Sequence, residues 1–308
     1  MMNRFTVKSL LALGLLIALV SFNACQKENL QVAATTGTPS LSATDRAPLM
    51  YGVTLYGGIG KPSRLIEINV GTGAVTNAPG VPVFYMNGNN PVFLNDLKGI
   101  SWVNGQLFVT TGPNNPGLYA NALIKVATTG QAGFISSTPP VIGTVSDINY
   151  DETTGVIYGL RNNSNTLITI TDNGNNWGTY TNVGAITNLG NGYVAKGLSL
   201  VRDGAGIRLI VAASSNSATN TTQVYEVPTS AGFANPLAAI NPVSEMNQSH
   251  CAIGFQMAIN TMIINRGPTV TVSGLNSFGW ANPLPNPSPS TLWGAVNYIF
   301  EDLTSTIQ

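Results

Sequence analysis

The sequence predicts an all-β fold, and three observations support this prediction. Residues 98–111, KGISWVNGQLFVTT, are two apolar segments joined by Asn-Gly, a dipeptide typical of two-residue β-hairpin turns. Apolar pairs with the period of two of a β-strand recur at Ile100/Trp102, Ile148/Tyr150, Leu198/Leu200, Ile253/Phe255 and Val296/Tyr298. The first residues of these pairs lie 48, 50, 55 and 43 positions apart. This interval matches one four-stranded blade of a β-propeller.

Each apolar pair marks the first strand of a predicted blade. Second strands are predicted at GQLFVTT, GVIYGL, IRLIVAAS and TMIINR. Third strands are predicted at ALIKVATTG, TLITITDNG, TQVYEVPTSAG and PTVTVSG. Two predicted fourth strands, FANPLAA and GWANPLPN, contain proline. Because proline is confined to edge strands, these strands should be outermost in their blades.

The two ends of the chain are predicted to complete one blade together. Residues 49–57, LMYGVTLYG, are predicted as a second strand, followed by RLIEINVGTG and AVTNAPG as third and fourth. Residues 292–303, LWGAVNYIFEDL, supply a first strand that nothing follows. Joining the ends gives five four-stranded blades and hides the sheet edges. A two-sheet β-sandwich is the alternative, since short strands at regular spacing also fit it.

Residues 1–24 are predicted to be a lipoprotein signal peptide. Arg4 and Lys8 precede an apolar stretch of eleven residues, 10–20, which is too short to span a bilayer. Residues 22–25, Phe-Asn-Ala-Cys, resemble a bacterial lipobox, and this resemblance implies a lipid on Cys25 and a place at the outer membrane or cell surface. The Gln-Lys-Glu that follows resembles the export tag of Bacteroidota surface lipoproteins. A periplasmic or secreted protein is the alternative.

The rest of the chain divides into a flexible tether, 25–47, and a propeller domain, 48–308. Loss of the signal peptide takes Arg4 and Lys8 from the 13 basic residues and leaves 11 against 13 acidic ones, a net charge near −2. This charge argues against a nucleic acid partner. With lipid on Cys25, the other cysteine has no disulfide partner. No metal or other cofactor is expected.

Two segments carry a family resemblance. RLIEINVGTG and TGVIYGL resemble the blades of the broad group of propellers with LY.ID..TG-type repeats, and the similarity covers most of residues 48–303. The resemblance implies the fold and leaves the function open, because such propellers include ligand binders, scaffolds, lactonases and glycosidases.

An enzyme built on this fold would need paired carboxylates around the axis. The acids on or near predicted first strands are Asp147, Asp96, Glu301 and Asp302, and only Asp147 occupies a repeat position that other blades fill with Gly or Ala. One carboxylate is not a catalytic pair. We therefore expect a noncatalytic cell-envelope module that binds a glycan or a protein. A glycosidase or lactonase-like hydrolase that uses Asp147 is the alternative.

Ligand binding is predicted on one face of the ring. Loops that enter first strands and loops that join second to third strands share this face, and they are long and varied, whereas the turns of the other face are short. The side chains predicted at this mouth are Asp96, Lys98, Tyr119, Asp147, Arg161, Lys196, His250 and Trp293. The alternative is that these loops only cover the ring, with Trp293 packed inward.

Overall fold

The computed structural model describes the greater part of the predicted propeller domain. The described residues are 49–54, 60–136, 141–161, 164–172, 177–203, 206–215, 222–240, 251–256, 261–269, 272–279, 291–295 and 300–306. Cys25, the predicted signal peptide, the tether and His250 lie outside these residues. Within the described ranges, no helix has the length and apolar character needed to cross a membrane.

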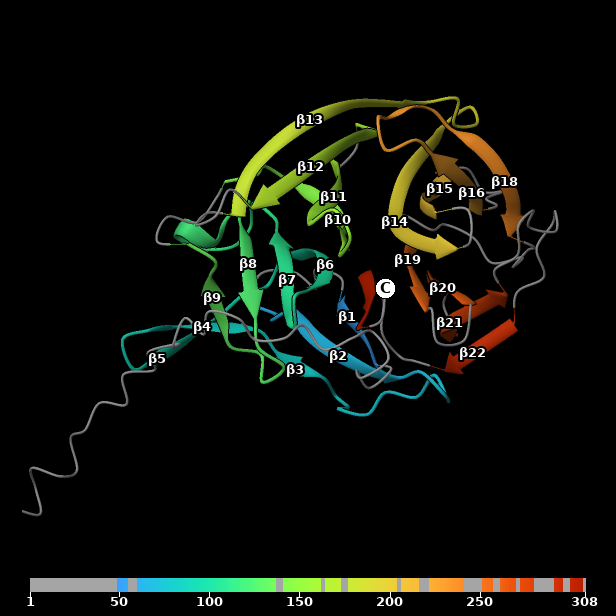
Figure 1. Ribbon diagram of the computed structural model, residues 1–308. Helices are drawn as coiled ribbons and strands as arrows, with labels where there is room; N and C mark the ends of the chain where they lie inside the picture. Colours follow the sequence, from blue (N-terminus) through green and yellow to red (C-terminus); the bar gives the residue numbers. More distant parts are fainter. Residues whose placement is uncertain are drawn as a thin grey trace, which may run out of the picture. The chain divides into compact units, whose positions relative to one another are not determined.

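Five sheets form a ring, which confirms the predicted β-propeller (Figure 1). Blade one contains, from the axis outward, β23 (Phe300–Ser305), β1 (Leu49–Thr54), β2 (Arg64–Asn69) and β3 (Val81–Pro82). Blade two contains β6 (Leu97–Val103), β7 (Gln106–Thr111), β8 (Leu123–Val126) and β9 (Ala132–Phe134). Blade three contains β10 (Val145–Asp151), β11 (Val156–Arg161), β12 (Thr166–Asp172) and β13 (Trp177–Thr187).

The last two blades follow the same order. Blade four contains β14 (Tyr193–Asp203), β15 (Gly206–Ser215), β16 (Thr222–Val227) and β18 (Asn235–Ile240). Blade five contains β19 (Cys251–Gln256), β20 (Thr261–Thr269), β21 (Val272–Gly279) and β22 (Thr291–Ala295). The inner strands β23, β6, β10, β14 and β19 each contact the next, and β19 contacts β23, so the ring is closed.

Two features depart from the predicted plan of four strands per blade. The short strand β17 (Gly232–Phe233) pairs in parallel with the end of β13, so the sheet of blade three has five strands. A separate ribbon of β4 (Phe84–Asn87) and β5 (Asn90–Phe93) lies in the connection between blades one and two. Both additions occur outside the inner strands and leave the axis unchanged.

The chain ends do share blade one, but the predicted first strand at 292–303 is wrong. Its first half belongs to β22, the outermost strand of blade five, and β23 begins only at Phe300. Gly52 of β1 lies opposite Leu303, and a Cβ on Gly52 would come within 2.3 Å of the Phe300 ring. The absence of a side chain at Gly52 therefore lets the C-terminal strand close the ring.

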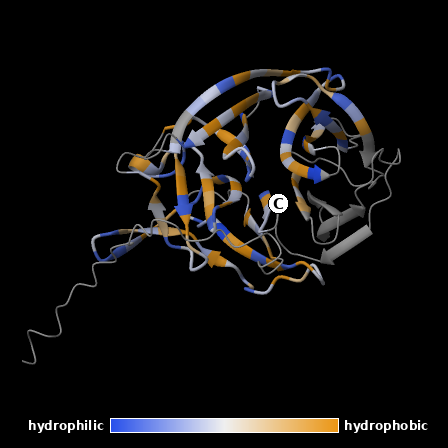
Figure 2. Cartoon of the chain, viewed as in Figure 1, coloured by the Kyte–Doolittle hydropathy of each residue, from blue (hydrophilic) through white to orange (hydrophobic). Residues whose placement is uncertain are grey.

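Three further strand predictions are wrong: AVTNAPG is a turn before β3, PTVTVSG contains the end of β20 and the start of β21, and β22 takes the outermost place in blade five that was predicted for GWANPLPN. Other local predictions agree with the structure. The turn between β6 and β7 is the predicted Asn-Gly turn, with a positive φ at both Asn104 (47°) and Gly105 (84°), as a type I′ hairpin requires. Pro82 and Pro236 lie in β3 and β18, the outermost strands of their blades. Figure 2 shows hydrophobic and hydrophilic residues alternating along the strands, and the apolar sides pack between blades. The core thus consists of layers between neighbouring blades.

Candidate functional site

A β-bulge recurs where the inner strands begin. The pairing register shifts at this point in blades one to four, and one residue in each bulge is Glu301, Lys98, Ser146 or Lys196. A bulge adds an unpaired residue and redirects its side chain, and such irregularities are frequent beside binding sites. The first strand of blade five, β19, pairs with β20 without a shift. Four blades therefore present one polar bulge residue each at the same mouth of the ring.

Lys98 joins two of these blades through buried ion pairs. Its Nζ lies 2.9 Å from Glu301 Oε1 and 3.0 Å from Asp96 Oδ1. The side chains of Lys98, Glu301 and Asp96 are 16%, 7% and 1% exposed. Burial alone would lower the pKa of Lys98, but the carboxylates of Glu301 and Asp96 raise it above its usual value. Lys98 is therefore a fixed cation at neutral pH.

The loop after β7 holds Asp96 in place. Asp96 Oδ2 accepts hydrogen bonds from the backbone N and the Nδ2 of Asn114, at 3.1 and 2.9 Å. Asn115 Nδ2 donates to the carbonyl of Asp96 at 2.6 Å, and its Oδ1 accepts from the backbone N of Asn95 at 3.0 Å. A Cβ on Gly112 would lie 2.2 Å from Asp96 Oδ2. Asn114 and Asn115 were not among the predicted site residues, although their GPNNPG segment is typical of a tight loop.

Asp147 and Asp302 each follow the bulge residue of their inner strand by one position, and their carboxyl groups interact with each other. Asp147 Oδ2 accepts a hydrogen bond from the backbone N of Leu198, and Asp302 Oδ2 accepts one from Ile100 N, at 2.6 and 2.7 Å. Each acid thus bonds to the inner strand of the next blade, so the two occupy equivalent positions. The prediction that only Asp147 holds this repeat position is wrong, because the misplaced C-terminal strand concealed Asp302.

Both of these acids are fully buried, with 0% exposure. Burial, followed by the charge of Asp302, raises the pKa of Asp147 well above its usual value. Burial also raises the pKa of Asp302, although its hydrogen bonds to Asp147 and to backbone N–H groups oppose the shift. Neither carboxyl group is therefore accessible from the mouth.

The other predicted site residues do not form one cluster in the structure. Tyr119 is 7% exposed and stacks between Tyr85 and Phe134, with ring centroids 4.1 and 4.5 Å away, so it packs in the core. Arg161 ends β11 at the same end of the blade as Ser146, and its Cζ lies 4.8 Å from the centroid of the Tyr180 ring.

Trp293 requires a correction. It was expected on a first strand at the mouth, but it lies on β22, the outermost strand of blade five (Figure 1). The reason is the same as for Asp302, because the strand predicted at 292–303 is divided between two blades. His250 lies outside the described residues. Of the eight predicted residues, the structure brings Asp96 and Lys98 into contact and gives Lys196 an equivalent bulge position in another blade.

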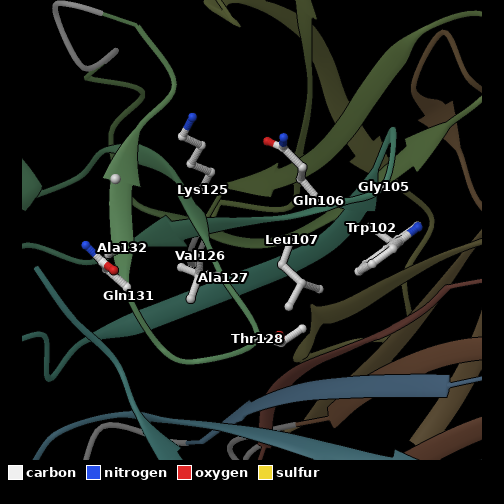
Figure 3. Close-up of a pocket in the computed structure, with 11 residues that line it drawn as sticks. Trp102, Gly105, Gln106, Leu107, Lys125, Val126, Ala127, Thr128, Gln131 and Ala132 are labelled. Carbon is white, nitrogen blue, oxygen red and sulfur yellow. The ribbon is translucent and has the colours of Figure 1, made fainter. Parts of the chain in front are cut away.

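A cavity of about 470 Å³ lies at the opposite end of blade two (Figure 3). Trp102, Leu107 and Val126 occupy facing positions on three neighbouring strands and contribute its apolar lining. Gly105 and Thr128, which also line it, belong to the β6–β7 and β8–β9 turns. The cavity is therefore on the short-turn face, away from the bulge residues. Among the described side chains, no three of His, Cys, Asp or Glu gather as a metal site would require.

Comparison with known proteins identifies no family for this chain. No family model matches the sequence, and no curated protein matches it. Kuenenia stuttgartiensis hydrazine synthase is similar in structure, with 10% identity and a TM-score of 0.40 over 74% of this chain and 59% of the synthase chain. TolB from Acinetobacter baumannii shows 9% identity and a TM-score of 0.43 over 84% of this chain and 66% of its own.

A third similar structure is the periplasmic gluconolactonase of Pseudomonas aeruginosa, with 11% identity and a TM-score of 0.42 over 84% of this chain and 98% of that one. This chain thus spans less than two thirds of the length of the first two proteins. With all three TM-scores below 0.5, these similarities carry no weight for the activity of this protein. The β-propeller assignment rests on the sheets of the chain itself.

Proposed function

We propose that this protein is a noncatalytic, lipid-anchored module of the cell envelope that binds a glycan at the mouth where the inner strands begin. The observation that carries the proposal is the recurrence of the bulge with a polar residue, namely Glu301, Lys98, Ser146 and Lys196, in four successive blades. Long connections on this face include residues 112–122 between β7 and β8 and 241–250 between β18 and β19, whereas residues 280–290 join β21 to β22 on the opposite face. Long loops of this kind suit recognition.

The charges at the mouth favour a neutral polar ligand over a polyanion. Lys98, Lys196 and Arg161 lie at the same mouth as the acids Asp96 and Glu301, so charges of both signs are present there. A mixture of cationic, carboxylate and hydroxyl groups can donate and accept hydrogen bonds in many directions. Sugar hydroxyls need both donors and acceptors, which is why we propose a glycan ahead of a protein ligand.

A hydrolase is the less favoured function. General acid catalysis needs a carboxyl group within hydrogen-bonding reach of the substrate. Asp147, the residue proposed for this role, is fully buried against Asp302, and Lys98 already binds Asp96 and Glu301. Incubation of the protein with glycosides and lactones should therefore release no product. Turnover that is lost in an Asp96→Asn or Glu301→Gln variant would contradict the noncatalytic proposal.

Replacement of Lys196 by Ala tests the binding site. The full-length protein is first screened against an array of envelope polysaccharides, and the affinity for the best glycan is measured by calorimetry. Loss of one hydrogen bond from a charged group should weaken binding about tenfold to a hundredfold. Lys125→Ala is the matched control, since Lys125 is also a half-buried strand lysine but lines the cavity on the other face. Equal affinities of wild type and Lys196→Ala would count against the proposed site.

Replacement of Cys25 by Ser tests the anchor. The variant should move from the membrane fraction to the soluble fraction with an unchanged melting temperature, because the predicted tether separates the lipid from the domain. Fractionation with metabolic labelling by a fatty acid measures the effect. Recovery of the wild-type protein entirely in the soluble fraction, without label, would disprove lipidation.

A further inference from the structure

We propose that Asp147 and Asp302 share a single bound proton, and that this proton-bound pair joins the inner strands of four blades at the axis. The pair connects blades one and three, which are not neighbours in the ring. Blade two lies between them, and its inner strand has Gly99 at the equivalent position. A Cβ on Gly99 would lie 2.8 Å from Ile148 N and 2.9 Å from Asp147 Cα. The missing side chain thus lets the two acids meet.

The hydrogen bonds indicate which acid carries the proton. Asp302 Oδ2 accepts from Ile100 N at 2.7 Å, and Asp302 Oδ1 accepts from its neighbour Leu303 N at 2.6 Å. Asp147 Oδ2 accepts from Leu198 N at 2.6 Å, whereas Asp147 Oδ1 is buried and receives no donor from the described residues. A carboxylate with backbone donors on both oxygens is stable as an anion. The proton therefore lies on Asp147 Oδ1 and is donated to Asp302.

Two ionised carboxylates in contact, both with 0% exposure, would be too costly to bury together. The pair needs one proton or one cation to reduce its charge. Two basic side chains on the neighbouring strands form ion pairs with other acids. On the neighbouring strands, Lys98 binds Asp96 and Glu301, and Arg202 binds Asp151. The other titratable groups on the strands that pack against the pair are Tyr51, Tyr150, Tyr158, Arg161, Tyr193, Lys196, Asp203 and Cys251. None of these groups contributes to the raised pKa of either acid.

This arrangement links folding to proton uptake. In the unfolded chain an aspartate loses its proton near its ordinary pKa of 3.8, whereas in the folded ring the pKa of Asp147 is raised well above this value. The folded state therefore holds one more proton at any pH between these values. Its stabilising contribution is full below pH 3.8 and is lost as the pH rises toward the folded pKa.

Replacement of Asp147 by Asn tests the shared proton. The amide reproduces a protonated carboxyl group, with one donor toward Asp302 and one acceptor toward Leu198 N, but it does not titrate. We expect the unfolding equilibrium constant of the wild type to rise by about tenfold per pH unit more than that of Asp147→Asn, from pH 5 up to the folded pKa of the pair, where the two slopes become equal. Urea unfolding of the full chain at several pH values measures this difference. Parallel slopes for the two proteins would overturn the proposal.

Replacement of Asp302 by Asn serves as the matched variant. Its amide nitrogen would face one of the two backbone donors that Asp302 accepts, so we expect the folding equilibrium constant to fall about tenfold to a hundredfold further than in Asp147→Asn. Equal effects of the two substitutions would contradict the assignment of the proton to Asp147. Infrared spectra keep the test independent of the variants, because folded wild-type protein with carbon-13 aspartate should show the carbonyl band of a protonated acid at pH 5, above the ordinary aspartate pKa of 3.8. Absence of that band would overturn the proposal.

Discussion

Deletion of residues 300–308 is expected to abolish cooperative folding. All six residues of β23 are buried, and Phe300 and Leu303 have no exposed surface. Loss of one large apolar side chain from a core costs about 3 to 5 kcal/mol for Phe and 2 to 5 for Leu. These two losses alone approach the total stability of a typical domain, about 5 to 15 kcal/mol. The deletion also removes Asp302 from the axis and exposes the inner edge of β1.

Circular dichroism during heating measures this effect on the purified full-length and shortened chains. Deletion of Ile307 and Gln308 alone is the control, and it should melt at the wild-type temperature because β23 is kept. If the chain without residues 300–308 still unfolded in a single transition at the original temperature, closure of the ring by β23 would be wrong.

Replacement of Lys98 by Met should cause the second largest loss of stability. The change removes the cation between Asp96 and Glu301, whose side chains are 1% and 7% exposed. Removing one partner of a buried ion pair costs about 3 to 5 kcal/mol, because an unpaired charge remains. A methionine of similar length retains the packing of the aliphatic stem, so the loss should be electrostatic in origin.

Chemical denaturation of Lys98→Met measures this loss. Lys61→Met, at an exposed lysine, should change the free energy of unfolding by less than about 0.5 kcal/mol. Addition of Glu301→Gln to Lys98→Met should recover part of the stability, because one of the unpaired charges is then removed. A Lys98→Met protein as stable as the wild type would show that the ion pairs contribute nothing to the ring.

The strand order of the propeller could be predicted from the sequence because each strand has its own pattern in consecutive residues. Period-two patterns and the Asn104-Gly105 turn depend only on residues near one another in the chain. The sequence contains a signal that the predicted first strand at 292–303 was misplaced. The spacing of 43 between Ile253 and Val296 was short, whereas Leu303 follows Ile253 by 50 positions and directly follows an aspartate, as Ile148 does. The contact between Phe300 and Gly52, which fixes the alignment, is visible only in the folded chain.

The site was less predictable because burial depends on the tertiary structure. Loop length did not distinguish Tyr119, stacked between two aromatic rings, from the half-buried Lys196. It also did not single out one polar face, because Asp151 and Arg202 form an ion pair at the opposite ends of the inner strands. Bulges also have no clear pattern in one sequence. The shifts at Ser146 and Lys196 became apparent from the strand register alone.

Hydrogen exchange of the full-length protein, with and without the best glycan from the array, tests most directly where this protein binds its ligand. Backbone amides near a bound glycan should exchange more slowly, because the ligand excludes water and restricts local opening. The proposed site predicts protection in residues 95–99, 144–147 and 194–197, where the inner strands begin. Protection in residues 102–107 and 125–133, which line the cavity of the opposite face, with none at the inner-strand starts, would contradict it.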